Sequence, residues 1–168
     1  MFRLQHHFCP NRDFVGYVGI VVFVVNMSQT SLPGITAISY IPVNNLPADL
    51  IFQALAGYPV TITATSTAIP LASIPICELE ESPDNNTQTE KAKLTFTTLD
   101  TLPTSTPLAF LITTAAGNHY ILGTRERLYP TIKATTNTST PDTAAAVHKY
   151  EVSFTARKAL IPYLPNPR

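Results

Sequence analysis

The chain has 168 residues, about one domain, and 45% of them are hydrophobic, which is enough for a core. Its 11 basic and 11 acidic residues cancel, and charged residues make up only 13%, against about 25% in typical soluble domains. No basic stripe is visible, so nucleic-acid binding through phosphate contacts is not expected. Threonine and proline are frequent whereas Glu, Lys and Arg are scarce, a balance that favours strands over helices.

Residues 1–34 are expected to lie outside the folded domain. Within them, residues 14–25 form an apolar run that is too short for a membrane span of about 20 residues. The run has three interpretations: the core of a signal peptide behind Arg3 and Arg12, a buried strand, or an extension upstream of the true start. The third is favoured, because an ordinary polar domain start follows Met27 and the cleavage site that a signal peptide needs is poor.

Residues 35–157 are predicted to form one β domain. Its clearest element is a hairpin over 108–123, where two apolar runs flank a corner with Gly117 and Asn118, residues that tolerate positive φ. In the strand over 90–98 the alternation predicts three side chains pointing inward, Ala92, Leu94 and Phe96, with Lys91, Lys93, Thr95 and Thr97 pointing outward. The other expected strands are 35–43, 58–66, 71–80, 128–134 and 147–157. Pro42 within the first of them suggests an edge position in the sheet or a bulge.

The segment 45–57 is the one plausible helix, with Asn45 as a cap, Pro47 in the first turn and Gly57 just past the end. The apolar side chains that would share its buried face are Leu46, Leu50, Ala54 and Leu55. A strand over 49–55 is the rival interpretation.

The remaining segments are polar or rich in proline. Residues 135–146 are expected to form a mobile loop, and the proline-rich tail 158–168 an extended arm. The predicted fold class is therefore all-β, a single-domain antiparallel sandwich or barrel with at most one short helix.

Chemistry-bearing motifs are missing from the sequence. It contains no serine nucleophile elbow, HExxH, P-loop or GxGxxG pattern, so catalysis is not expected. His6, His7 and Cys9 lie close together, but a metal site needs three or four convergent ligands and nothing completes this one. His119 and His148 are interpreted as exposed polar residues. No metal or other cofactor is predicted.

Arg125, Glu126 and Arg127 form the one dense charge triplet of the predicted domain. A solvated turn is the simplest interpretation, and a contact with a neighbouring subunit is the functional alternative, because Arg pairs well with carboxylates at interfaces. The acidic cluster of residues 78–84 is interpreted as a solvated strand end and loop. Cys77 is expected to be a small buried apolar residue on a strand.

The body carries an early I-x-x-I-x-Y-x-P-V strand, a Cys-Glu strand, LTFTT, FLIT with GNHYILGTRE, and YEVSFTARKALIP. Across residues 35–162 this order resembles small structural proteins encoded in phage and prophage regions of Bacteroides-type bacteria. The resemblance implies a virion component near the tail or the head–tail junction, present in the bacterial cytoplasm before assembly, and it carries over no functional residues.

The leading hypothesis is accordingly a non-catalytic virion protein that assembles with itself, as a ring or tube, and with other virion proteins. Its domain is not expected to bind membranes. The alternative is an exported β-sandwich binding module on the cell surface, for which the signal-peptide interpretation of the N-terminal run would hold.

Overall fold

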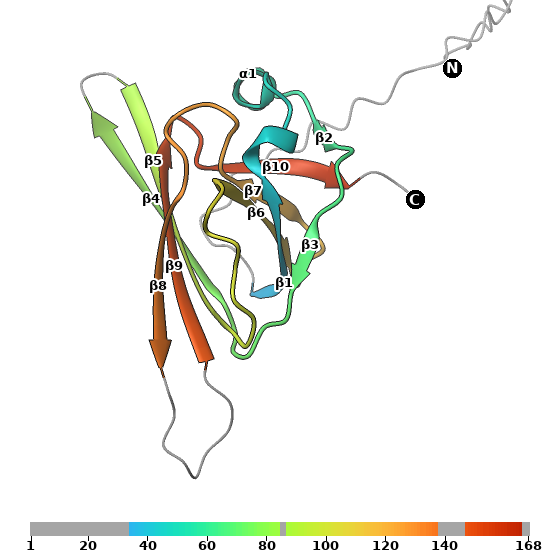
Figure 1. The fold of residues 1–168 in the computed structure, drawn as a ribbon. Helices are drawn as coiled ribbons and strands as arrows, with labels where there is room; N and C mark the ends of the chain where they lie inside the picture. The colour runs from blue at the N-terminus through green and yellow to red at the C-terminus, as the bar shows by residue number, and fades with distance from the viewer. Residues whose placement is uncertain (1–33, 85–86, 138–146, 166–168) are drawn as a thin grey trace, which may run out of the picture.

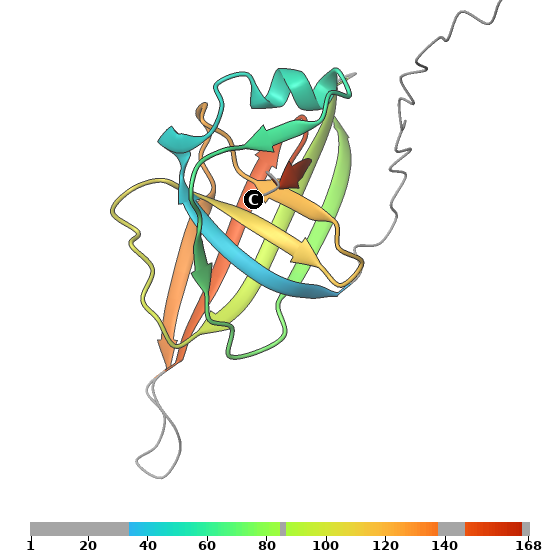
Figure 2. The same cartoon turned by 90° about the vertical axis from the view of Figure 1, so that its right-hand side faces the viewer.

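The structure, a computed structural model, describes residues 34–84, 87–137 and 147–165 of the chain. Within these ranges ten strands form two sheets that pack face to face, together with one short α-helix (Figure 1). The predicted all-β class is confirmed, and of the two expected architectures the fold is the sandwich. Figure 2 looks onto the face of one sheet and shows that its strands cross those of the sheet behind it rather than running along them.

The front sheet in Figure 2 has six strands in the order β2-β10-β7-β6-β1-β3. Their bounds are β1 (Ile35–Pro42), β2 (Val60–Ile62), β3 (Thr67–Ile69), β6 (Leu108–Thr114), β7 (His119–Leu122) and β10 (Leu160–Pro165). All neighbours are antiparallel except β10 and β2. The predicted hairpin is confirmed as β6 and β7, and Gly117 has a φ of 79° in its turn, where a side chain would be strained.

The rear sheet has four strands in the order β4-β5-β9-β8, and every neighbouring pair is antiparallel. Their bounds are β4 (Ile76–Asp84), β5 (Thr87–Thr98), β8 (Thr131–Asn137) and β9 (Val147–Ala156). The predicted pairing of the two segments near 71–80 and 90–98 is confirmed by the β4–β5 ladder.

The main core lies between the two sheets. The predicted inward residues of β5 are all buried there, and Phe96 is 1% exposed. Its ring centroid lies 5.5 Å from that of Tyr150 on β9 and 5.9 Å from that of Phe110 on the opposite sheet. The Leu102 N–H donates a hydrogen bond to the buried Tyr150 hydroxyl over 3.0 Å, so the loop after β5 is attached to this aromatic cluster.

A second core covers the other face of the six-stranded sheet. There a 3-10 turn, η1 (Val43–Asn45), and the helix α1 (Leu50–Leu55) pack over residues such as Leu111 and Ile121. The helix is shorter than predicted: Asn45 belongs to η1, and the N-cap of α1 is Asp49. Gly57 follows the helix at a φ of 74°, as expected for a residue that ends a helix.

Three further predictions need correction. The tail 158–168 is not simply a free arm, because Leu160–Pro165 forms β10 between β2 and β7, and its Leu160 and Ile161 are buried. β1 is an interior strand, with Pro42 at its end. The expected strand over 58–66 is confined to β2, and β3 follows separately.

Some predictions fall outside the described residues. These are the apolar N-terminal run and most of the expected loop over 135–146, although β8 continues to Asn137. In the described ranges no helix combines the length and the apolar character needed to cross a membrane.

Candidate interaction surfaces

The loop between β7 and β8 carries the charge triplet. Gly123, at its start, has a φ of 118°, and a Cβ there would lie 2.8 Å from Cγ of Pro130. Inside the loop the hydroxyl of Thr124 donates to the carbonyl oxygen of Glu126 over 3.2 Å. Arg125, Glu126 and Arg127 are all exposed, and no ion pair involves them within the described part of the chain. The structure therefore agrees with a solvated turn, and the contact with a neighbour stays a prediction.

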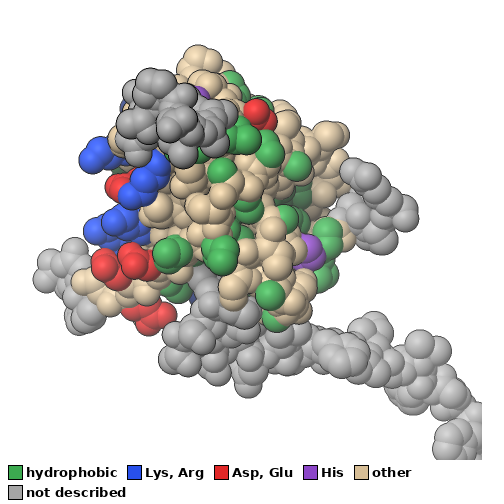
Figure 3. Space-filling view, turned by 90° about the horizontal axis from the view of Figure 1, so that it is seen from below, with side chains coloured by type: hydrophobic (Ala, Val, Ile, Leu, Met, Phe, Trp, Pro, Cys, Tyr) green, Lys and Arg blue, Asp and Glu red, His purple; other side chains and the backbone are tan. Residues whose placement is uncertain are grey.

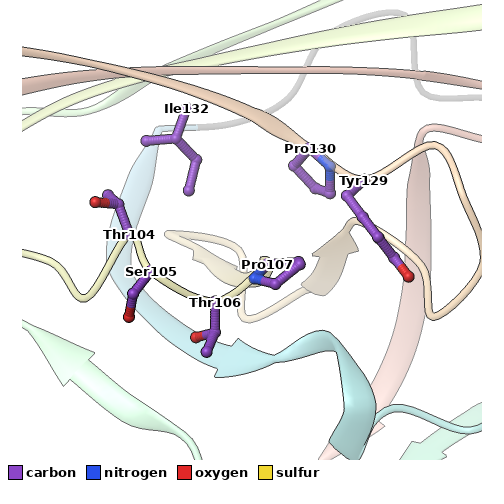
Figure 4. A pocket seen from close by; sticks show the side chains of 7 residues that line it. All are labelled: Thr104, Ser105, Thr106, Pro107, Tyr129, Pro130 and Ile132. Atoms are coloured by element: carbon purple, nitrogen blue, oxygen red, sulfur yellow. The ribbon is translucent and has the colours of Figure 1, made fainter.

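The same loop borders a hollow with a volume of about 290 Å³ (Figure 4). One wall consists of Tyr129, Pro130 and Ile132, and the facing wall is the segment 104–107 between β5 and β6. The side chains that line the hollow carry four hydroxyl groups, from Thr104, Ser105, Thr106 and Tyr129, together with the tyrosine ring and apolar surface, and none of them is charged. The hollow is open and its lining is uncharged, and the sequence analysis did not identify it.

Helix α1 and the segment that follows it leave three large apolar side chains exposed, which together we call the α1 patch. Its members are Phe52, Leu55 and Tyr58, which are 68%, 49% and 69% exposed. The prediction that Leu55 faces the core is therefore wrong, although Leu50 is buried as expected. The spacing of Phe52 and Leu55 by three residues was the available signal, because side chains at i and i+3 lie on one side of a helix; Tyr58 lies beyond the end of the helix and has no such signal.

The outer face of the four-stranded sheet is polar and charged. Figure 3 shows Lys, Arg, Asp and Glu side chains gathered on the side where Figure 1 places this sheet. On this face Lys91 Nζ lies 3.9 Å from Glu80 Oε2, and Lys149 Nζ lies 3.4 Å from Glu151 Oε1. All four side chains are at least one-third exposed, so each pair contributes little stability on its own.

Glu90 on β5 is a buried acidic residue that the sequence analysis missed. It is 6% exposed and accepts a hydrogen bond from the Ala159 N–H over 2.9 Å, while Lys158 Nζ lies 3.2 Å from its other oxygen. These contacts hold the turn by which the chain passes from β9 to β10. Glu90 lies two residues before Ala92 on the same strand, so its side chain points to the same buried face. This spacing was the signal in the sequence for its burial.

The two described histidines occupy polar sites. His119 Nδ1 lies 3.1 Å from the hydroxyl of Thr113, and its ring centroid is 5.6 Å from that of Tyr163. His148 Nδ1 lies 3.0 Å from the hydroxyl of Thr136. Both histidines are half-buried rather than exposed as predicted. Both histidines are therefore tied to neighbouring threonine hydroxyls.

Cys77 on β4 is half-buried beside the main core. Burial, with a smaller contribution from neighbouring Glu78, raises the pKa of its thiol to about 12, so the thiol stays protonated and unreactive near neutral pH. Among the described residues no group of three or more His, Cys, Asp or Glu side chains could hold a metal ion. The cluster of His6, His7 and Cys9 lies outside those residues.

Comparison with known proteins adds no relative. No protein-family model, curated protein or solved structure matches the chain.

Proposed function

We propose that this chain is a non-catalytic structural subunit of a phage or prophage virion, acting in tail or head–tail connector assembly through contacts with itself and with other virion proteins. The α1 patch is the observation that carries the proposal. Large apolar side chains gathered on an exposed surface are typical of a surface that a partner covers. Together with Leu128, which is 76% exposed beside the charge triplet, the patch offers apolar contact area on a molecule with few charges to keep copies apart.

The resemblance of residues 35–162 to small phage structural proteins supports the same proposal. A β-sandwich suits the role because its two packed sheets provide a rigid body, while its loops and covering helix present contact surfaces. Arg125 and Arg127, which project from the loop after β7, are suited to carboxylates on a neighbouring subunit.

The test joins two measurements on the full chain. Sedimentation velocity of the purified protein should reveal species larger than the monomer, and mass spectrometry of purified particles from the host should contain its peptides. Phe52→Ser with Tyr58→Ser should reduce association, whereas Thr155→Ser, on an exposed polar surface, should leave it unchanged. A strictly monomeric protein that is absent from every particle would refute the proposal.

The hollow beside Tyr129 favours one second candidate, an exported surface module that binds a neutral ligand. Its lining combines the Tyr129 side chain with hydroxyl groups, and hydroxyl groups are among the polar groups that orient ligands in small-molecule sites. A mature N-terminus near residue 26 in a cell-envelope fraction would favour this candidate. The same protein found in particles, with its N-terminus elsewhere, would favour the virion.

A further inference from the structure

We propose that copies of this chain join edge to edge, with β4 of one copy pairing antiparallel to β8 of the next, so that the four-stranded sheets merge into a continuous sheet. The inference rests on the proposed function and specifies one contact, in addition to the α1 patch, by which the subunits assemble. Such head-to-tail contacts close into a ring or continue as a helical array.

The two strands at issue are both free to pair. β4 and β8 are the outer strands of the sheet, each with one hydrogen-bonded neighbour in the described part of the chain, and they span nine and seven residues. A free strand edge exposes a row of unpaired N–H and C=O groups that accepts another strand. Leu79 on β4, although it points to the core side, is 37% exposed at this edge and would gain cover from an added strand.

The direction of the strands suits this contact. All three neighbouring pairs in the order β4-β5-β9-β8 are antiparallel, so β4 runs opposite to β8 within one copy. A second copy in the same orientation, placed beside the first, therefore brings its β4 antiparallel to the free β8. The core side of both sheets stays on the same side of the merged sheet.

Charge on the outer face distinguishes β4–β8 pairing from other edge contacts. β4 presents Glu78 and Glu80 on this face, and β8 presents Lys133, all three exposed. Residues directly opposite one another on antiparallel strands lie about 4.5–5.5 Å apart and diagonal ones about 7–8 Å, so Lys133 opposite either glutamate also reaches the other. The contact continues the pattern inside the sheet, where Lys91 and Lys93 on β5 already lie opposite these two glutamates.

The same charges oppose the two symmetric alternatives. Pairing β4 with β4 would bring four glutamates together, and pairing β8 with β8 would bring two copies of Lys133 together. Like charges on adjacent strands destabilise a sheet. Charged residues on edge strands commonly prevent pairing in monomeric proteins. Here the two edges carry opposite charges, so two β4 edges or two β8 edges repel each other, whereas β4 of one copy attracts β8 of another.

Charge reversal on each edge provides the test, with the full-length chain throughout. The variants are Glu78→Lys with Glu80→Lys on β4, and Lys133→Glu on β8. Each alone should raise the protein concentration for half-maximal assembly by about tenfold, because attractive pairs become repulsive at every junction. An equimolar mixture of the two should regain assemblies of wild-type mass, because every junction between unlike copies again joins opposite charges.

Lys93→Glu is the matched control, since it reverses a charge on the same face but on the interior strand β5, and it should assemble as the wild type does. Circular dichroism of each variant checks that the sheet has formed. If the double reversal does not fold, Glu78→Gln with Glu80→Gln replaces it, because this variant removes both attractions without placing lysines opposite Lys91 and Lys93.

Several results would overturn the edge contact. If the wild type assembles and neither reversal changes the required concentration, the edges are not the interface, although the proposed function would stand. If only the β4 variant loses assembly and the mixture does not recover, β4 meets a different partner surface. A wild-type chain that is found in particles but stays monomeric at every concentration tested would also overturn the contact and leave the virion role intact.

Discussion

Truncation of Phe96 to alanine gives the sharpest test of the main core. The side chain is 1% exposed, and its ring lies against Tyr150 from its own sheet and Phe110 from the other sheet. Removing such a ring costs the lost burial and leaves a cavity, together about 3–5 kcal/mol. That is a large share of the total stability of a typical domain, about 5–15 kcal/mol, and corresponds to a drop in melting temperature of roughly 6–20 °C.

The assay is urea denaturation followed by circular dichroism, in which Phe96→Ala should lower the midpoint without changing the slope. Thr95→Ala is the control, because Thr95 points to the outer face and should cost no more than about 1 kcal/mol. Phe96→Asp should yield insoluble protein, since it places an unpaired charge in the core. A larger loss for Thr95→Ala than for Phe96→Ala would show that the inward and outward faces are reversed.

Three other changes are expected to have measurable effects. Gly123→Ala should lower the melting temperature, because its Cβ would clash with the loop and its positive φ is unfavourable for alanine; an unchanged melting curve would contradict this. Glu90→Ala should destabilise by about 1–3 kcal/mol in urea denaturation by leaving the Ala159 N–H unpaired, whereas Glu90→Gln, which retains an acceptor, should cost less. In a Cys9→Ser background, Cys77 should react slowly with a thiol reagent at pH 8 and rapidly in denaturant. Equal labelling rates in the native and denatured states would contradict the burial of this thiol. Because burial raises the pKa of the folded thiol to about 12, its protonated form stabilises the fold, and this contribution should be complete below the ordinary thiol pKa and decline as the pH rises above it.

The four-stranded sheet was the part most accessible from the sequence. Alternation with a period of two predicts well which face of the sheet each side chain points to when one face is buried and the other is solvated. A shift of the strand by one residue would expose every apolar side chain. Ala92, Leu94 and Phe96 are accordingly all buried. The same alternation, continued two residues back from Ala92, leads to Glu90, but only the folded turn around Ala159 explains how a carboxylate is accommodated there.

The C-terminal strand was missed because two signals conflict in it. Pro162 and Pro165 lack an N–H group and indicated an arm, since proline is disfavoured inside sheets. In the structure, burial of Leu160 and Ile161 outweighs that local preference, and β10 lies between two other strands. A parallel pairing with β2, about 100 residues earlier in the chain, has no local signature in the sequence.

The candidate surfaces were only partly predictable. The charge triplet was visible as a sequence pattern, but the hollow forms where two loops distant in sequence meet. The α1 patch could not be predicted reliably because it depends on where the helix begins. The helix begins at Leu50, not near Asn45 as predicted, and this changes which side chains belong to the helix face that packs on the sheet. Free strand edges likewise emerge only from the order of strands in the sheets.

The placement of β10 has a consequence for biosynthesis. Ribosomes make about 5–20 residues per second, so roughly 5–20 s separate the emergence of β2 from that of the strand it pairs with. Until β10 has been made and Tyr163 pairs with Val60, β2 and β7 of the nascent six-stranded sheet lack the strand that lies between them. A host chaperone that covers these unpaired edges during translation would raise the yield of native protein. A stop codon before Leu160 would leave both edges without a pairing strand.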